Sequence, residues 1–148
     1  THTRELKQLT THEEKMKLHH IAFWTENIER SIEFYKKHFN ASVLFRHTAG
    51  DFSCVFIEIS SGTKIEIMTR TGISGADLSE RTGYSHFSLE VGSKEEVDRL
   101  TDYFISQNAV MKKVKEQYND GFYESAVCDP DGNIIELAYV DRAVNPKV

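Results

Sequence analysis

YSHFSLEVGSKEEVDRL, residues 84–100, has a counterpart in HHIAFWTENIERSIEFYKKHF, residues 19–39, and these two stretches decide the fold. In each, a strand-like run that contains a histidine leads into a helix-like run with apolar side chains at helical spacing. The matching histidines, His20 and His86, lie 66 residues apart. Such self-similarity is typical of a chain built from two copies of one structural unit.

The similarity extends to two copies, residues 18–69 and residues 84–140. Turn sequences precede the last strand of each copy, SerGly at 61–62 and AspProAspGly at 129–132. The expected helices are Asn27–Phe39 and Lys94–Gln107, and the expected strands are Leu18–Trp24, Ser42–His47, Ser53–Ser60, Lys64–Thr69, Tyr84–Val91, Val110–Glu116, Tyr123–Asp129 and Asn133–Val140. We therefore expect an α+β fold, with two tandem βαβββ modules forming a curved eight-stranded cup.

The length of 148 residues favours a single domain with its own core. We place this domain at residues 18–140, with the segment 70–83, which holds three glycines, as the linker between the two modules. Residues 1–17 are polar and predict an N-terminal arm, and residues 141–148 form a C-terminal tail.

Composition narrows the class of partner and the compartment. The formal net charge is −5 and no block of Lys and Arg is present, which argues against a nucleic-acid surface. No apolar run of membrane-spanning length and no signal-peptide segment is found, so we expect no membrane partner. Cys54 and Cys128 lack CxxC spacing, and we expect buried free thiols in a cytoplasmic protein.

The alternation of side chains along the strands selects four residues with metal-binding side chains. In YSHFSLEV the apolar residues alternate with His86, so this histidine lies on the face opposite the helix. The same phase selects His20 over its neighbour His19. Glu66 and Glu136 each interrupt an apolar strand, so both are expected on the face that carries the histidines.

A carboxylate in an apolar strand is costly to bury unless it is paired or bound to a cation, and here it occurs at equivalent positions of both copies. We expect His20, Glu66, His86 and Glu136 to bind one divalent cation, with positions left open for water or substrate. Ni²⁺ and Zn²⁺ are the first candidates, and Co²⁺, Mn²⁺ and Fe²⁺ suit the same ligands. Whether the site forms within one chain or across two stays open.

The two opening stretches, together with GTKIEIM (62–68) and DPDGNIIEL (129–137), resemble the vicinal oxygen chelate superfamily. This superfamily includes glyoxalase I, bleomycin-resistance proteins, methylmalonyl-CoA epimerase and extradiol dioxygenases. The resemblance covers nearly all of residues 18–140, and it implies paired βαβββ modules that form a metal-binding cup in a homodimer. Within the superfamily, the order His, Glu, His, Glu is most similar to glyoxalase I.

Other members of the superfamily fit the ligand set less well. Extradiol dioxygenases are expected to use two histidines and one carboxylate on Fe²⁺, and methylmalonyl-CoA epimerases tend to have Gln where this chain has Glu66. Bleomycin-resistance proteins generally lack the ligands. Glyoxalase I typically carries an Arg and an Asn that contact glutathione where this chain has Trp24 and Arg70, so these two are the expected substrate-binding residues.

The resemblance implies a lyase that isomerises the hemithioacetal of a 2-oxoaldehyde and a thiol, a small-molecule substrate. Glu136, and secondarily Glu66, would transfer the proton through an enediolate, with the cation as Lewis acid. Two alternatives stay open. One is another metal-dependent enzyme of the superfamily, an epimerase or a dioxygenase, and the other is a non-catalytic binder of small molecules.

Overall fold

The computed structural model of the protein describes residues 16–60, 62–75 and 79–148. The predicted arm 1–17 therefore lies outside the described residues except for its last two, as do Ser61 of the first predicted turn and residues 76–78 of the linker. The chain divides into two compact units, which meet between Ile73 and Ser74 in the sequence.

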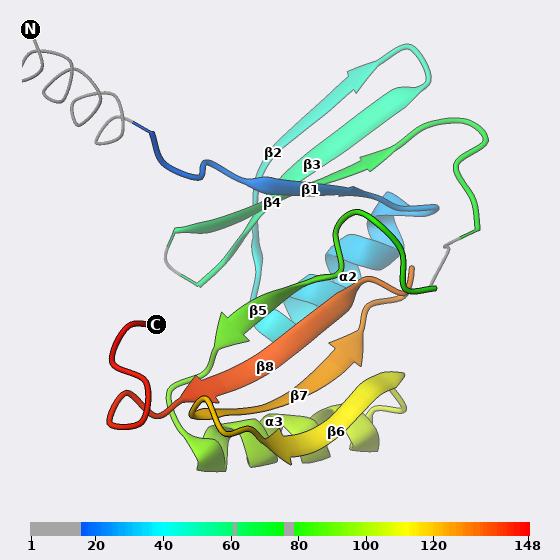
Figure 1. Ribbon diagram of the computed structural model, residues 1–148. Helices are drawn as coiled ribbons and strands as arrows, with labels where there is room; N and C mark the ends of the chain where they lie inside the picture. Colours follow the sequence, from blue (N-terminus) through cyan, green and yellow to red (C-terminus); the bar gives the residue numbers. More distant parts are fainter. Residues whose placement is uncertain (1–15, 61, 76–78) are drawn as a thin grey trace, which may run out of the picture. The chain divides into compact units, whose positions relative to one another are not determined.

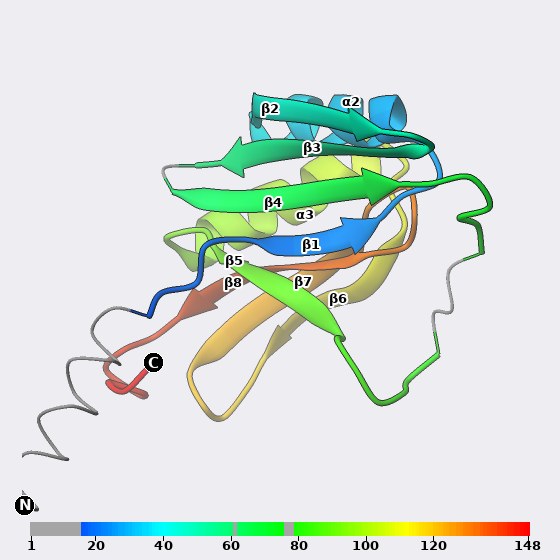
Figure 2. The same ribbon diagram turned by 90° about the horizontal axis from the view of Figure 1, so that it is seen from above.

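The first unit is one βαβββ module. Its strands form a four-stranded sheet in the order β1-β4-β3-β2, with β1 parallel to β4 and the other pairs antiparallel. Figure 2 shows these four strands side by side. The elements are β1 (Ile21–Trp24), α2 (Ile28–Phe39), β2 (Ser42–Ala49), β3 (Phe52–Ile59) and β4 (Thr63–Thr69).

The second unit repeats this plan. Its sheet has the order β5-β8-β7-β6, again with one parallel pair, β5 with β8. The helix of this unit lies along one face of the sheet (Figure 1). The elements are β5 (His86–Glu90), α3 (Lys94–Ser106), β6 (Met111–Gln117), β7 (Phe122–Cys128) and β8 (Ile134–Val140). The expected pair of βαβββ modules is thus confirmed.

Each helix begins at a polar cap. The side chain of Asn27 accepts a hydrogen bond from the backbone N–H of Arg30, and Ser93 accepts one from Glu96, both at 3.1 Å. A side-chain acceptor at this position satisfies a backbone donor that has no partner inside the helix. The apolar residues that follow lie on the helix face that packs against the sheet. Because this pattern is regular, both helices lie within one residue of their predicted bounds.

The core of each unit lies between its helix and one face of its sheet. The largest fully buried side chains come from the helix and from the two central strands, where alternate residues turn inward. In the first unit they are Tyr35, Val55, Ile57, Ile65 and Ile67, and in the second Val97, Phe104, Val127, Ile135 and Leu137. The opposite face of each sheet is therefore free to carry polar side chains.

Two predicted strands are shorter than expected, because β1 begins at Ile21 and β5 at His86. Each is an edge strand that runs parallel to the last strand of its module, with Ile21 opposite Ile65 and His86 opposite Ile134. In the second unit the residues before His86 would stand opposite Asn133 and Gly132, which precede β8, so the ladder has no partner for them. In the first unit His19 and His20 would stand opposite Thr63 and Lys64 of β4, and the register does not account for the later start of β1.

The two cysteines are free and buried, as the sequence predicted. Among the described helices, none has the length and apolar character needed to cross a bilayer. The cytoplasmic location stays a prediction.

Candidate metal and substrate site

Each unit places one of the predicted histidines beside one of the predicted glutamates. Nε2 of His20 lies 3.6 Å from Oε1 of Glu66, and Nε2 of His86 lies 3.1 Å from Oε1 of Glu136. The glutamate side chains are 18% and 13% exposed, and those of the histidines 33% and 37%. The register explains both contacts, because each glutamate pairs with the residue two positions after its histidine and thus shares its face.

The residue before each histidine lies within hydrogen-bonding distance of the other ring nitrogen, Nδ1. Nδ1 of His20 is 2.8 Å from Nδ1 of His19, and Nδ1 of His86 is 2.9 Å from the hydroxyl oxygen of Ser85. Histidines that bind metals through Nε2 usually have such a partner on Nδ1, which fixes the ring and its tautomer. The sequence interpretation rejected His19 as a ligand, and the structure gives it this supporting position instead.

The donor atoms of each pair suit a shared cation. Two ligands that each lie about 2.1 Å from one metal ion are about 3.0 to 3.4 Å apart in octahedral or tetrahedral geometry. The distances of 3.1 Å and 3.6 Å approach this range. Among the described residues, no group of three His, Cys, Asp or Glu side chains has the geometry to hold a metal ion, so each unit supplies one pair. That four ligands share one ion, within one chain or in a homodimer, stays a prediction.

The surroundings of Glu66 are aromatic and apolar. The ring of Phe56 packs edge-on against His20, with centroids 5.0 Å apart, and Phe45 lies beside Phe56 at 6.5 Å. The thiol of Cys54 hydrogen-bonds to Glu66, and burial together with this carboxylate raises the pKa of that thiol. Cys54 is therefore a neutral neighbour of the first His–Glu pair at physiological pH.

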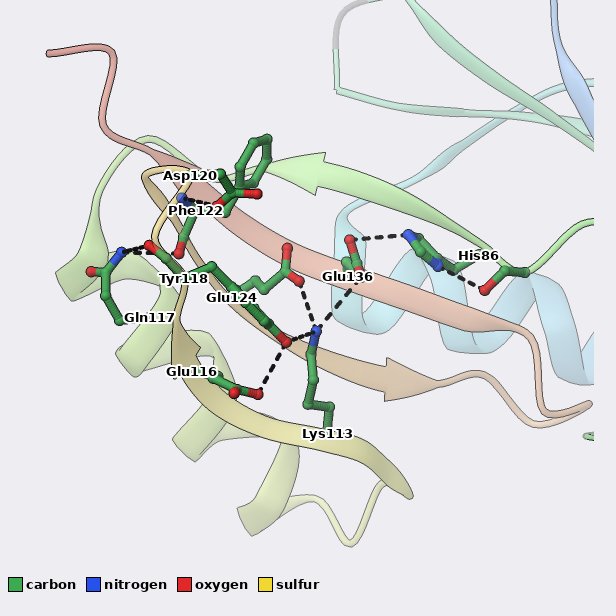
Figure 3. Close-up of polar contacts among 10 residues, drawn as sticks. His86, Lys113, Glu116, Gln117, Tyr118, Asp120, Phe122, Glu124 and Glu136 are labelled. Atoms are coloured by element: carbon green, nitrogen blue, oxygen red, sulfur yellow. Dashed lines mark hydrogen bonds and ion pairs between the residues drawn. The ribbon is translucent and has the colours of Figure 1, made fainter. Parts of the chain in front are cut away.

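The surroundings of Glu136 are charged instead (Figure 3). Nζ of Lys113 lies 3.8 Å from Oε2 of Glu136 and 2.7 Å from Oε1 of Glu124. Burial and the Glu124 carboxylate raise the pKa of Glu136, while His86, Lys113 and a hydrogen bond from Ser88 oppose that rise. The two glutamates therefore differ in the charge of their surroundings.

The two predicted substrate-binding residues meet at one aromatic ring. The indole of Trp24 packs edge-on against Phe52, with centroids 6.3 Å apart, and the guanidinium of Arg70 lies 5.4 Å from the centroid of the same ring. Trp24 is 44% exposed, and Arg70 is exposed as well. A cation and an exposed aromatic side chain thus lie together at the end of β1 and β4 that follows the His–Glu pair.

Sequence reasoning missed Lys113, Glu124 and Phe52. Strand alternation could have found Glu124, which lies two residues before the partner of Glu136 on β7. It could not have found Lys113, because register shifts on both sides of this residue break the period of two in β6. His47 of β2 stacks on Phe45.

The chain is built from two βαβββ modules. Each carries a His–Glu pair on the face of its sheet that lies away from its helix, and these features define a class of paired-module proteins. Residues 17–137 match the Glyoxalase/Bleomycin resistance protein/Dioxygenase superfamily, and the chain belongs to this superfamily.

Similar proteins within this class differ in activity. The chain is 28% identical over 136 residues to the trivalent organoarsenical cleaving enzyme of Bacillus sp. (strain MD1), covering 87% of this chain and 76% of that enzyme. Glyoxalase I of Leishmania major shares the fold, with a TM-score of 0.69 at 24% identity, over 84% of this chain and 87% of that one.

The fosfomycin resistance protein FosX from Listeria monocytogenes is also similar. A structure of its mutant, complexed with Mn(II) and 1S,2S-dihydroxypropylphosphonic acid, aligns with a TM-score of 0.67 at 25% identity. The alignment covers 88% of this chain and 95% of that one.

Proposed function

We propose that the protein is a divalent-metal-dependent enzyme of the glyoxalase I type, which isomerises the hemithioacetal of a 2-oxoaldehyde and a thiol. One observation carries this proposal: a His–Glu pair, with a partner on Nδ1 of the histidine, recurs at equivalent positions of both units. Two imidazoles and two carboxylates suit a catalytic ion, since they leave coordination positions open. The Mn(II) in the FosX structure supports a metal in this fold.

His20, Glu66, His86 and Glu136 would hold the ion. When bound, a divalent cation supplies Lewis-acid polarisation of the substrate oxygens. Glu136 takes the proton from the hemithioacetal carbon on a carboxylate oxygen and returns it to the neighbouring carbon, while the hydroxyl proton of the first carbon passes to the oxygen of the second, so the net change is an isomerisation. Glu66 is the second candidate for this exchange.

Arg70 and Trp24 bind the substrate outside the reacting carbons in this proposal. Arg70 provides a positive charge for a carboxylate of the thiol, and Trp24 and Phe52 provide an apolar edge. Arg70→Met is therefore expected to raise KM about tenfold and to leave kcat near the wild-type value, because it removes binding common to ground state and transition state. Initial rates over a range of substrate concentrations measure both. A fall in kcat with unchanged KM would contradict this role.

The test of the function uses metal-stripped protein reloaded in turn with Ni²⁺, Co²⁺, Zn²⁺ and Mn²⁺. Formation of lactoylglutathione from methylglyoxal and glutathione is measured for each ion, beside the metal content of the protein. We expect turnover that depends on the metal, and we expect Glu136→Gln to abolish it while most of the metal stays bound.

Glu33→Gln is the control, because Glu33 is exposed on α2 and outside the site. Loss of turnover and of metal together in Glu136→Gln would make Glu136 a ligand alone. Absence of turnover with every ion, in protein that holds metal, would rule out the glyoxalase activity with this thiol.

Cleavage of a trivalent organoarsenical is the second candidate. Two observations favour it: the similarity to the Bacillus enzyme, and the thiol of Cys54 beside Glu66. Soft centres prefer thiolate ligands. Each unit nevertheless has a single cysteine, Cys54 in the first and Cys128 in the second, and this places the candidate second.

Release of inorganic arsenic from a trivalent organoarsenical tests this candidate, with protein loaded with each of the same ions and Fe²⁺. Release that needs the metal and is lost in Cys54→Ala would establish it. Release that is equal in wild-type protein and in Cys54→Ala would exclude a role for this thiol.

A further inference from the structure

Lys113 lies at the centre of a network found in the second unit (Figure 3). Its Nζ donates hydrogen bonds to Oε1 of Glu124 at 2.7 Å and to the hydroxyl of Tyr118 at 3.0 Å, and it lies 3.8 Å from Oε2 of Glu136. The Tyr118 hydroxyl donates in turn to Glu116. The side chain of Lys113 is 27% exposed, and those of Glu124 and Glu136 are 12% and 13% exposed.

The network separates two carboxylates that would otherwise repel each other. Glu136 is paired with Ala126, and Glu124 lies two residues before Ala126 on the same face of β7. When two poorly solvated carboxylates lie on neighbouring strands, the charge of each strongly disfavours ionisation of the other unless a cation lies between them. Lys113 supplies that cation from the third strand, where it pairs with Ala126 on the side away from Glu136.

Among the described residues of the first unit, no such network occurs at the equivalent positions, although the fold is the same. The residue equivalent to Lys113 is Phe45, which is paired with Phe56, the partner of Glu66. The residue equivalent to Glu124 is Cys54. The module therefore folds without a Lys–Glu pair at these positions, and the pair points to a task at Glu136.

We propose that Lys113 is a positioning residue that, held by Glu124, fixes the carboxylate of Glu136 with Oε2 toward Lys113 and Oε1 toward His86. This inference rests on the proposed function, because it assigns the geometry of that same site. Oε1 is the oxygen 3.1 Å from Nε2 of His86, so a cation bound by this pair meets a carboxylate that is already oriented. Orientation of a ligand by its outer partners typically changes metal affinity about tenfold or more.

Direct binding of the substrate by Lys113 fits the contacts less well. An ammonium group has three N–H donors. Two are used by Tyr118 and Glu124, and the third faces Glu136. A negatively charged substrate would also approach two carboxylates at this position. The geometry therefore favours an action through Glu136.

Three variants test the proposal. Lys113→Met keeps the apolar stem and removes the charge, Lys113→Arg keeps the charge, and Lys113→Met combined with Glu124→Gln removes both members of the pair. The Kd for Co²⁺ is measured on stripped protein, beside kcat, KM and the Tm of each variant. Lys115→Met is the matched control, because Lys115 lies on the same strand and pairs with Asp98 on α3.

We expect Lys113→Met to weaken Co²⁺ binding about tenfold and to lower kcat, with KM little changed. Lys113→Arg retains most of the affinity, and the double variant recovers it in large part, because the repulsion from Glu124 is gone. Co²⁺ affinity and kcat at the wild-type level in Lys113→Met would overturn the proposal. So would a rise in KM alone, or a double variant as weak as the single one.

The Co²⁺ measurement separates this proposal from the proposed function. If lactoylglutathione is never formed and yet Lys113→Met weakens Co²⁺ binding and the double variant restores it, the positioning role stands and the glyoxalase activity does not. The Tm values identify a variant that has lost its fold, and Lys113→Arg then carries the test, since loss of affinity with an intact fold would contradict positioning by charge.

Discussion

His20 and His86 depend on their immediate neighbours for the direction of their rings. Because His19 and Ser85 hold Nδ1, each ring turns Nε2 toward its glutamate. The same arrangement in both units, made by different side chains, indicates that the position before the histidine serves the site and not the strand.

Ser85→Ala tests this role. Without the hydroxyl, the ring of His86 loses its partner on Nδ1, and we expect the affinity for Co²⁺ to fall about tenfold while the Tm of the metal-free protein changes little, because Ser85 is exposed. Competition with a coloured chelator measures the affinity. Ser85→Thr keeps a hydroxyl and is expected to bind like the wild type. Equal affinity in all three proteins would show that the contact does not serve the site.

For individual residues, the sequence predicted the His–Glu pairs but not the side chains that surround them. Glu66 and Glu136 could be placed because regular alternation in β4 and β8 leaves them no other face. Lys113 could not, since the shifts in β6 leave Lys112, Lys113 and Lys115 indistinguishable in sequence. Nor could the contact of Trp24 and Arg70 with Phe52, which depends on side-chain packing.

Helices and strands followed the sequence where local signals were strong. Apolar side chains at helical spacing gave α2 and α3 to within one residue at each end. The starts of β1 and β5 were placed too early, and for β5 the reason is that an apolar pattern does not show where its partner strand begins. The end of β2 was placed too early as well, since its pairing with β3 continues to Ala49.

The packing of α3 on its sheet includes a tie between Tyr123 of β7 and Asp98, whose carboxylate accepts a hydrogen bond from the phenol. This bond, helped by Lys115, holds the pKa of Asp98 below its ordinary value of 3.8. It also raises the pKa of Tyr123 from 10.0 to about 12. The tie therefore stabilises the fold fully between the ordinary pKa values of Asp98 and Tyr123. It is lost as the pH falls through the lowered pKa of Asp98 or rises through the raised pKa of Tyr123.

Tyr123→Phe is expected to lower the Tm by a few degrees at neutral pH. The difference from the wild type should shrink as the pH falls through the lowered pKa of Asp98, because a protonated carboxyl no longer favours this bond. Thermal unfolding followed by circular dichroism at neutral and acid pH measures it. Tyr84→Phe is the control, since Tyr84 is fully exposed. A difference that is the same at both pH values would argue against an ionic contribution to the tie.

At the scale of the whole molecule, the two units share the His–Glu pair and differ in the side chains around it. Both units keep a His–Glu pair, but aromatic side chains surround Glu66 and a lysine and a second carboxylate surround Glu136. This difference favours Glu136 for proton transfer and leaves Glu66 suited to a ligand role. The repeat was predictable from sequence, because the pattern of elements recurs. The difference between the two units was not, because it lies at positions whose neighbours are known only from the fold.

The central claim is that the two pairs bind one divalent cation, and the metal content of purified variants tests it most directly. Stripped protein is loaded with Co²⁺, freed of excess ion by gel filtration and analysed for metal per chain. We predict one ion per chain in the wild type and almost none in either His20→Ala or His86→Ala, while His38→Ala, outside both pairs, keeps the full amount. Metal that stays bound in both single variants would show two independent half-sites and contradict the account.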